Sequence, residues 1–429
     1  MKKSLIIICF VFICLIPIIH KNRIETKNKK FYVYIKEGDN YVKQSTSSFP
    51  ISGYALNTTE SSCTGGGVLS QDLSTGKIKV SISGTDKCNL YFDPTARKVI
   101  TDLVGNAPTN STNVITATAP SGATCTNTLA YDGTTDNNLR YVGTNPCNYV
   151  SFNSENDGAG AWRIIGIMNN IDDGTGNTET RIKLVRATTI GTYSWDSSDG
   201  TINSGNGVND WSYADLKNEL NGDYLDLTLT ANPTNWYNGQ SNAQTGEFDI
   251  NKRLGATAQG MIGNAKWNLG GGSYGTNNAN LITSTSYVKE RDTVTWSTSH
   301  TCEDGACPRT TEWVGKVALP YPSDYGYATA GGTTTTRANC IGTVTLYSWN
   351  SSDYTDCKNN DWLKSPSGYY WLLTPYNGVA DEALETYSGG FVRTTKLYNA
   401  YNVRPTVYLK SNIAITGGNG TTTSPYTLG

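Results

Sequence analysis

WRIIGIM, at residues 162–168, and RIKLVRA, at 181–187, are the two stretches that decide the fold of this chain. Both are short strand-like segments that contain β-branched residues, and the polar loop at 172–178 separates them. Two such segments joined by a polar connection are typical of an antiparallel hairpin. We therefore expect a β-hairpin here and a further strand at PTVYL, residues 405–409.

One nearby segment has the spacing of a helix instead. SYADLKNELN, at 212–221, places Leu216 and Leu220 on one face, four residues apart. Ser212 and Asp215 form a start that is similar to a capping box. The strands and this helix together predict an α+β domain with long Gly- and Asn-rich loops.

The N-terminus predicts an export segment. In residues 1–30, Lys2 and Lys3 precede an apolar run at 5–19, and a basic stalk follows. As a helix, the run would cover about 22 Å, which is shorter than the roughly 30 Å hydrocarbon core of a membrane. Because no pair of small residues offers a cleavage site after it, we expect an uncleaved apolar helix that serves as a membrane anchor.

The rest of the chain predicts two domains and a linker. Residues 31–100 form a small β domain, because KIKVSIS at 77–83 alternates polar and apolar residues as a half-buried strand does. Residues 101–124 are rich in Thr, Ser, Pro and Asn, a composition that is typical of linkers. The larger domain covers 125–429.

The cysteines indicate the compartment. Two of the ten lie in the apolar N-terminus, and the other eight fall into neighbouring pairs without CxxC spacing. This favours disulfides formed in an oxidising compartment over zinc ligation. His300 beside one pair lacks a fourth ligand nearby, so we expect no metal there. Spacing leaves other connectivities open, and we expect Cys63–Cys88, Cys125–Cys147, Cys302–Cys307 and Cys340–Cys357.

Charge argues against one class of partner. The formal net charge is −2, and charged residues make up 16% of the chain, against about 25% in an average protein. No stripe of Lys and Arg with interleaved aromatic residues is present in the sequence. We therefore expect no nucleic-acid partner.

Several stretches of the larger domain occur in a familiar order: NNLRYVG, NYVSFN, AWRIIGI, NDWSYADLKNELN, WVGKVALPYPSDYGYA, DCKNNDWL, YWLLTP and NVRPTVYL. In this pattern, residues 125–429 resemble an uncharacterised domain family of exported bacterial proteins. That family is distantly similar in layout to the C-type-lectin-like fold, which formylglycine-generating enzymes share. The resemblance implies a looped α+β domain with a helix or two against a short antiparallel sheet. It implies no particular chemistry.

A short pattern occurs twice. YSWDSSD at 193–199 and YSWNSSD at 347–353 are each followed by Asn-Asp-Trp, at 209–211 and 360–362. If the resemblance holds, the tryptophans of both copies are core anchors, and the polar runs are turns held by side-chain to backbone hydrogen bonds. We favour this scaffold interpretation.

Two other interpretations of the repeat stay open. Calcium needs six to eight oxygen ligands, and Asp196, Asp199, Asn350 and Asp353 supply some of them only if the two copies meet in space. Alternatively, an exposed tryptophan stacks on a sugar ring while the acids and amides bind its hydroxyl groups. We expect no cofactor; calcium, bound through the repeat, is the alternative.

Candidate catalytic residues are few. His300 is the one histidine outside the N-terminal segment, and the serine of GGSYG at 271–275 lies in a glycine run without a flanking strand or helix. Every exported cysteine has a neighbouring partner, which argues against the cysteine chemistry of formylglycine-generating enzymes. We expect no enzyme; a glycan-active hydrolase that uses the acids of ADEALE, 380–385, is one alternative.

A binding protein fits the sequence better. The segment 376–401 lies between a core stretch and the last strand, where lectin-like folds often display ligand loops, and it carries Tyr376, Asn377, Asp381, Glu382, Tyr398 and Tyr401. Such side chains stack on and hydrogen-bond a glycan or a peptide. We expect a non-enzymatic protein of the cell surface that binds an extracellular glycan or protein ligand. The alternative is a structural cell-surface or pilus-like subunit.

Overall fold

The computed structural model describes residues 30–429, except for 39, 46–52, 72–77, 82–86, 110–111, 198–206, 240–244, 273–280, 294–299, 303–304, 308 and 365–367. The predicted N-terminal helix, the serine of GGSYG and Asp199 therefore lie outside the described residues. The described part is a mixed α+β structure in which strands predominate. None of its helices is long and apolar enough to cross a membrane.

The larger unit is built around a ten-stranded sheet with the order β21-β26-β13-β12-β10-β9-β8. A short branch, in which β11 pairs with β12 and β28 pairs with β11 and β27, completes it. The strands are β8 Ile115–Ala117, β9 Asn127–Tyr131, β10 Leu139–Tyr141, β11 Tyr149–Ser151, β12 Trp162–Asp172, β13 Thr178–Arg186, β21 Val317–Ala318, β26 Thr406–Tyr408, β27 Ile415–Gly417 and β28 Tyr426–Leu428.

The predicted hairpin forms the centre of this sheet. β12 and β13 are antiparallel, with Ile164 opposite Leu184 and Ile167 opposite Ile182. Residues 162–168 are all buried, which explains why the run, apart from Arg163, is apolar rather than alternating. Gly166 is required here, because a Cβ atom at this position would lie 2.2 Å from the carbonyl oxygen of Leu139 in β10. The predicted strand at 405–409 is also confirmed, as β26.

A second, five-stranded sheet has the order β14-β25-β22-β23-β24. It packs with the first sheet around one continuous core that includes seven fully buried tryptophans. Its strands are β14 Thr192–Tyr193, β22 Tyr370–Pro375, β23 Glu382–Tyr387, β24 Phe391–Lys396 and β25 Tyr401–Asn402.

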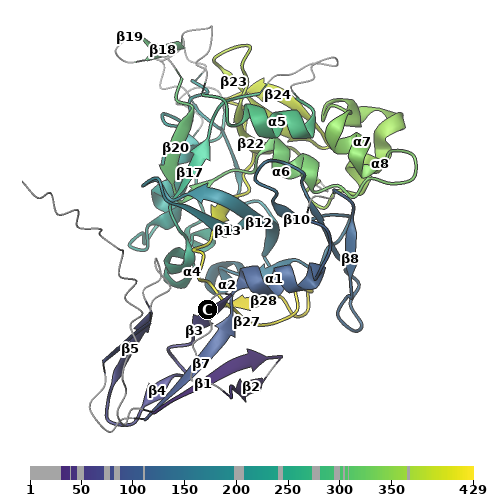
Figure 1. The fold of residues 1–429 in the computed structure, drawn as a ribbon. Helices are drawn as coiled ribbons and strands as arrows, with labels where there is room; N and C mark the ends of the chain where they lie inside the picture. The colour runs from purple at the N-terminus through teal and green to yellow at the C-terminus, as the bar shows by residue number, and fades with distance from the viewer. Residues whose placement is uncertain are drawn as a thin grey trace, which may run out of the picture.

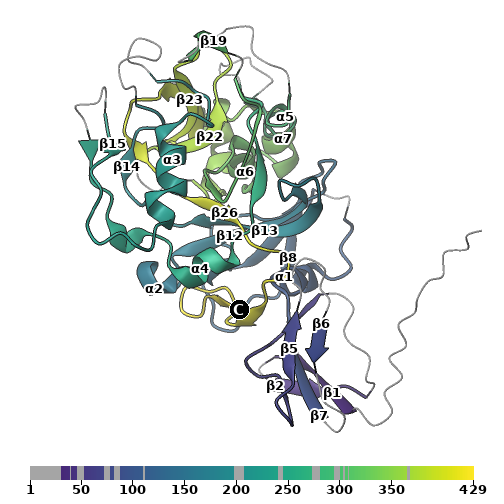
Figure 2. The same ribbon diagram turned by 90° about the vertical axis from the view of Figure 1, so that its left-hand side faces the viewer.

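Short helices surround the two sheets. α5, α6 and α7 lie together beside the five-stranded sheet in Figure 1, and α3 lies apart from them in Figure 2. The helices are α1 Ala96–Val104, α2 Ser154–Asp157, α3 Asp215–Asn221, α4 Ala256–Met261, α5 Thr283–Lys289, α6 Pro322–Tyr327, α7 Arg337–Gly342 and α8 Thr355–Asn359, with 3₁₀ turns η2 Asp223–Leu225, η3 Ile250–Lys252, η5 Ser348–Asn350 and η6 Ser352–Tyr354. Four two-stranded ribbons complete the structure: β5 Val68–Gln71 with β6 Ile78–Ser81, β15 Trp236–Tyr237 with β16 Thr245–Gly246, β17 Ala265–Asn268 with β20 Glu312–Gly315, and β18 His300–Cys302 with β19 Gly305–Cys307.

The predicted helix at 212–221 exists but begins later, at Asp215. The prediction of a capping box is wrong, because the Ser212 hydroxyl donates to the Asp210 carboxylate 2.6 Å away instead of capping the helix. The Asp196 carboxylate, from the first YSW copy, accepts from the Asp215 backbone N–H at 3.0 Å. A residue that is distant in sequence therefore takes the capping role.

A smaller sheet precedes the larger unit and lies at one end of the molecule in Figure 1. It has the order β2-β1-β7-β3, with β4 also paired to β7, and its strands are β1 Lys30–Glu37, β2 Asn40–Lys43, β3 Tyr54–Leu56, β4 Ser62–Cys63 and β7 Lys87–Pro94. Its core is separate from the main one and consists of Val33, Leu56, Cys88, Leu90 and Phe92.

The chain passes from the small sheet into the main core without an extended spacer. α1 packs against the main core through Ala96, Ile100 and Val104. Within 101–124, for which composition predicts a linker, lie the second half of α1 and strand β8, which pairs with β9. This range therefore adds one strand to the large sheet.

Three of the expected disulfides are present in the described part: Cys63–Cys88, Cys125–Cys147 and Cys340–Cys357. The backbones of Cys302 and Cys307 belong to the β18–β19 hairpin, but the structure does not describe their side chains. The fourth disulfide, Cys302–Cys307, therefore stays a prediction. Disulfides of this number indicate that the protein folds in an oxidising, extracellular environment.

Candidate functional site

The tryptophans of both YSW copies are core residues. Trp195 and Trp349 are fully buried. The Trp195 indole N–H donates to the carbonyl of Leu372, 3.2 Å away, and its ring lies 5.1 Å from that of Trp211. Trp349 packs against Tyr325 with a ring separation of 5.3 Å. The scaffold interpretation of these tryptophans is confirmed, and an exposed sugar platform at these two positions is wrong.

The polar residues of the two copies are arranged differently. Both carboxylate oxygens of Asp196 accept backbone N–H groups, from Val208 at 2.6 Å and from Asp215 at 3.0 Å. Asn350 and Asp353 are exposed in η5 and η6. Among the described residues, no three His, Cys, Asp or Glu side chains come together as a metal ion would require. Calcium binding that involves Asp199, which lies outside the described residues, stays a prediction.

The six residues of the predicted ligand segment are spread over the β23–β24 hairpin and its flanks. Asp381 and Glu382 both form ion pairs with Lys396, at 2.9 and 3.1 Å. Tyr401 is stacked on Tyr369 with a ring separation of 4.9 Å.

The other three of the six residues also contact the fold. The Asn377 side-chain oxygen accepts from Arg309, the backbone of Tyr376 pairs with that of Gly272, and the Tyr398 carbonyl accepts from Ser194. Ligand binding by this segment stays a prediction.

A pocket of about 540 Å³ lies where the two sheets meet. Strands β11 and β12 of the large sheet supply one wall, the turn after α8 supplies another, and the β23–β24 turn and the chain before β26 complete it. The lining residues are Thr144, Tyr149, Arg163, Ala187, Asp361, Trp362, Lys364, Ser388 and Arg404. Its size is that of a site for a small molecule or for one or two sugar rings.

Arg163 is held in a fixed position at the wall of this pocket. Its guanidinium lies between two aromatic rings, 4.3 Å from the centre of Tyr149 and 4.4 Å from that of Trp362. Its Nε donates to Asn148 at 2.7 Å and its Nη2 to the carbonyl of Pro146 at 3.1 Å. Its Nη1 has no hydrogen-bond partner among the described residues, and that nitrogen therefore remains for a ligand.

Arg404 is the second cation of the pocket. Its Nε donates to the carbonyl of Arg186 at 3.0 Å and its Nη1 to the carbonyl of Leu363 at 3.1 Å. Only 7% of each arginine, Arg163 and Arg404, is exposed, and neither forms an ion pair with a described residue. Burial lowers the pKa of Arg163 to about 10 and also lowers the pKa of Arg404. Both therefore carry their charge at neutral pH without an ion pair to a described carboxylate.

Asp361 is the acidic group of the pocket. Its Oδ1 accepts from the backbone N–H of Leu363 at 2.8 Å, whereas its Oδ2 is buried and has no partner. Burial raises the pKa of Asp361 well above its usual value, although the N–H groups of Leu363 and Lys364 and the charge of Arg404 act in the opposite direction. This direction favours the neutral form of the carboxyl group.

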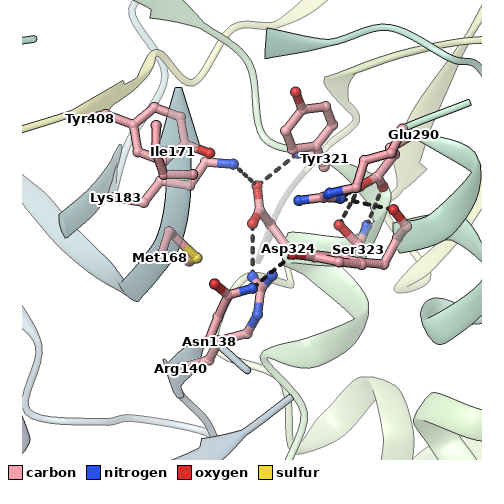
Figure 3. Close-up of a pocket in the computed structure, with 12 residues that line it drawn as sticks. Asn138, Arg140, Met168, Ile171, Lys183, Glu290, Tyr321, Ser323, Asp324 and Tyr408 are labelled. Carbon is pink, nitrogen blue, oxygen red and sulfur yellow. Dashed lines mark hydrogen bonds and ion pairs between the residues drawn. The ribbon is translucent and has the colours of Figure 1, made fainter. Parts of the chain in front are cut away.

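A second cluster of charges, shown in Figure 3, has a different character. Lys183 of β13 and Arg140 of β10 both contact Asp324 of α6, at 2.5 and 2.9 Å, and Arg140 also contacts Asp132 at 3.1 Å. Lys183 also lies among the rings of Trp267, Tyr321 and Tyr408.

The cavity among these charges measures about 10 Å³, which is room for one water molecule at most. Each of Lys183, Arg140 and Asp324 has a partner of opposite charge. This cluster fastens α6 to the large sheet and leaves no space for a ligand.

Sequence patterns alone do not mark Arg163 or Arg404 as site residues. Each is the single charged residue of an apolar motif, AWRIIGI or NVRPTVYL. A buried cation is rare unless it is paired, and a lone cation in an apolar motif is the signal that the sequence carries. What brings the two together is the pairing order of the sheet, which the sequence does not show.

No family model matches this chain, and neither a curated protein nor a solved structure shows a significant match to it.

Proposed function

We propose that this chain is a non-enzymatic recognition protein of the cell surface that binds an extracellular ligand in the pocket of Arg163 and Arg404. One observation carries the proposal: an open pocket of about 540 Å³ has two buried cations in its wall, and neither is paired with an acid among the described residues. Burying a charge without a counter-ion costs several kcal/mol of folding free energy, and such costs are typical of functional sites.

The pocket supports binding better than catalysis. Among the described residues that line it, the only carboxyl group is that of Asp361, and no histidine or cysteine is present. Glycoside hydrolysis by the usual route requires two carboxyl groups on opposite sides of the scissile bond. The hydrolase alternative therefore has less support at this pocket than recognition does.

The lectin-like character and the membrane anchor belong to the same proposal. A looped α+β unit with short antiparallel strands and peripheral helices is compatible with a C-type-lectin-like domain of the exported family that the sequence resembles. Disulfides support export. We place the N-terminal apolar segment in the membrane, with the small β sheet between the membrane and the binding domain.

A glycan and peptide array tests the proposal. The full chain, purified oxidised and shown to be folded by its melting curve, is probed with and without calcium. We expect a specific hit that a soluble competitor of the same class removes. A blank from the folded protein would refute ligand recognition and favour the structural-subunit alternative, for which self-association is the next measurement. Loss of the hit on chelation would support the calcium prediction.

A further inference from the structure

Resting on the proposed function, we infer that the pocket of Arg163 and Arg404 takes an acidic sugar, with the sugar carboxylate bound between the two guanidinium groups. A carboxylate is the natural partner for guanidinium N–H groups, which form short, charge-assisted hydrogen bonds with its oxygens. Arg163 is already fixed between two rings, so little conformational entropy is lost when its free Nη1 binds.

Asp361, the third group at the site, favours a singly charged anion over a dianionic phosphate. Its buried Oδ2 has no partner, and burial raises the pKa of its carboxyl group, which favours the neutral form. A neutral carboxyl group donates one hydrogen bond to an anionic oxygen, whereas an ionised one would repel it. A singly charged carboxylate that accepts from the two arginines therefore fits this site without excess negative charge.

The rest of the lining favours a sugar over a peptide. Thr144 and Ser388 are exposed at the rim, and Lys364 is half-buried beside them. The hydroxyl and ammonium groups of these three side chains can hydrogen-bond the several hydroxyls of a sugar ring. Trp362 and Ala187 supply an apolar wall for its C–H face. The two strands that reach the described lining, β11 and β12, are paired on both sides, so neither offers a free edge to a peptide.

The test compares ligands that differ in one group. An oligosaccharide that ends in a uronic acid is titrated calorimetrically into the full chain, beside the same oligosaccharide with its carboxyl group reduced to an alcohol, a sulfated one, and a peptide with a free C-terminal carboxylate. We expect the uronic acid form to bind and reduction to weaken binding at least tenfold. Equal binding of the acid and its reduced form would overturn the inference while leaving the proposed function intact.

Variants assign the effect to the pocket. Arg163→Gln should weaken the acidic sugar at least tenfold, and Lys364→Gln at the rim by a smaller factor. Lys98→Gln on α1, which removes a partly exposed cation outside the pocket, should have no effect. Should Arg163→Gln fail to fold, Arg163→Lys and Lys364→Gln decide the matter: unchanged affinity in both would overturn the inference.

The sulfated oligosaccharide and the peptide in the calorimetric titration distinguish the other kinds of ligand. Preference for the sulfated sugar would show an anion site without selection for a carboxylate, and preference for the peptide would show that the partner is a protein; either result overturns the acidic-sugar inference. If none of the four probes binds and the array is also blank, the proposed function fails together with it.

Discussion

Asp210 and Asp361 occupy the same position in the two Asn-Asp-Trp segments, yet the fold uses their carboxyl groups differently. Asp210 accepts three hydrogen bonds, from the Ser212 N–H and hydroxyl and from the Thr310 N–H. Asp361 accepts from Leu363 and keeps one buried oxygen without a partner.

The tryptophans that follow these acids differ in the same way. Trp211 is fully buried against Trp195 and Trp313, with ring separations of 5.1 and 6.3 Å. Trp362 covers Arg163 and lines the pocket. In the first copy, both the acid and the tryptophan stabilise the core. In the second copy, the carboxyl group and the aromatic ring line the pocket. The same Asn-Asp-Trp sequence supports either role, and the surrounding elements decide which.

The largest effect that the comparison predicts is at Trp211. Trp211→Ala should lower the free energy of unfolding by about 3–5 kcal/mol, because it leaves a large cavity between two other tryptophans. Chemical denaturation of the oxidised protein measures it. The matched control is Tyr213→Ala, two residues away and 53% exposed, which should cost little. An unchanged stability for Trp211→Ala would contradict the scaffold role of the first copy.

Asp210→Asn should have the next largest effect, a loss of roughly 2–3 kcal/mol. An amide keeps one acceptor oxygen and turns an NH₂ group towards a backbone or hydroxyl donor, so that at least one buried donor loses its partner. The same denaturation experiment measures this loss. A variant as stable as the natural protein would mean that the three hydrogen bonds are dispensable.

Trp362→Phe should cost about 1–2 kcal/mol. The substitution removes the indole N–H that donates to the Tyr141 carbonyl at 2.9 Å, but it keeps an aromatic ring over Arg163. Affinity for the ligand should therefore change less than it does in Arg163→Gln. If calorimetry shows a complete loss of binding in a folded Trp362→Phe protein, the indole itself contacts the ligand.

Asp361→Asn should have the smallest effect on stability. At neutral pH it should stabilise the protein, whereas the three preceding substitutions destabilise it. Since the folded-state pKa of Asp361 is raised, folding retains a proton that the unfolded chain releases above about pH 3.8. The natural protein therefore loses stability as the pH rises above that value, towards the raised pKa. The amide does not titrate, so Asp361→Asn should lose less stability over that range; melting curves across the pH range measure this. An identical pH profile for both proteins would show that Asp361 is ionised in the fold.

Parts of this structure follow from local sequence. The β12–β13 hairpin, the last strand and the burial of Trp195 and Trp349 were predictable, because apolar periodicity and large aromatic residues act through a general requirement for burial. Three of the predicted disulfide pairs also formed, because their partners are close in sequence.

Other parts depend on partners that are distant in the chain. The start of α3 depends on Asp196, which supplies its cap, and the range 101–124 adds a strand to the large sheet because β9 lies beside it. The pocket requires Arg163 and Arg404 to meet, which follows from sheet order alone. The sequence predicted a ligand segment at 376–401, and the pocket takes from that segment only Ser388.

The most direct test of the account is a matched pair of substitutions, Asp210→Asn and Asp361→Asn, with unfolding free energy and affinity for the uronic acid oligosaccharide measured on both. We predict that Asp210→Asn loses stability and that its folded fraction binds as the natural protein does. Asp361→Asn should keep its stability at neutral pH, and its effect should fall on the affinity for the acidic sugar. Equal effects of the two substitutions on both quantities would contradict the division between a structural copy and a binding copy.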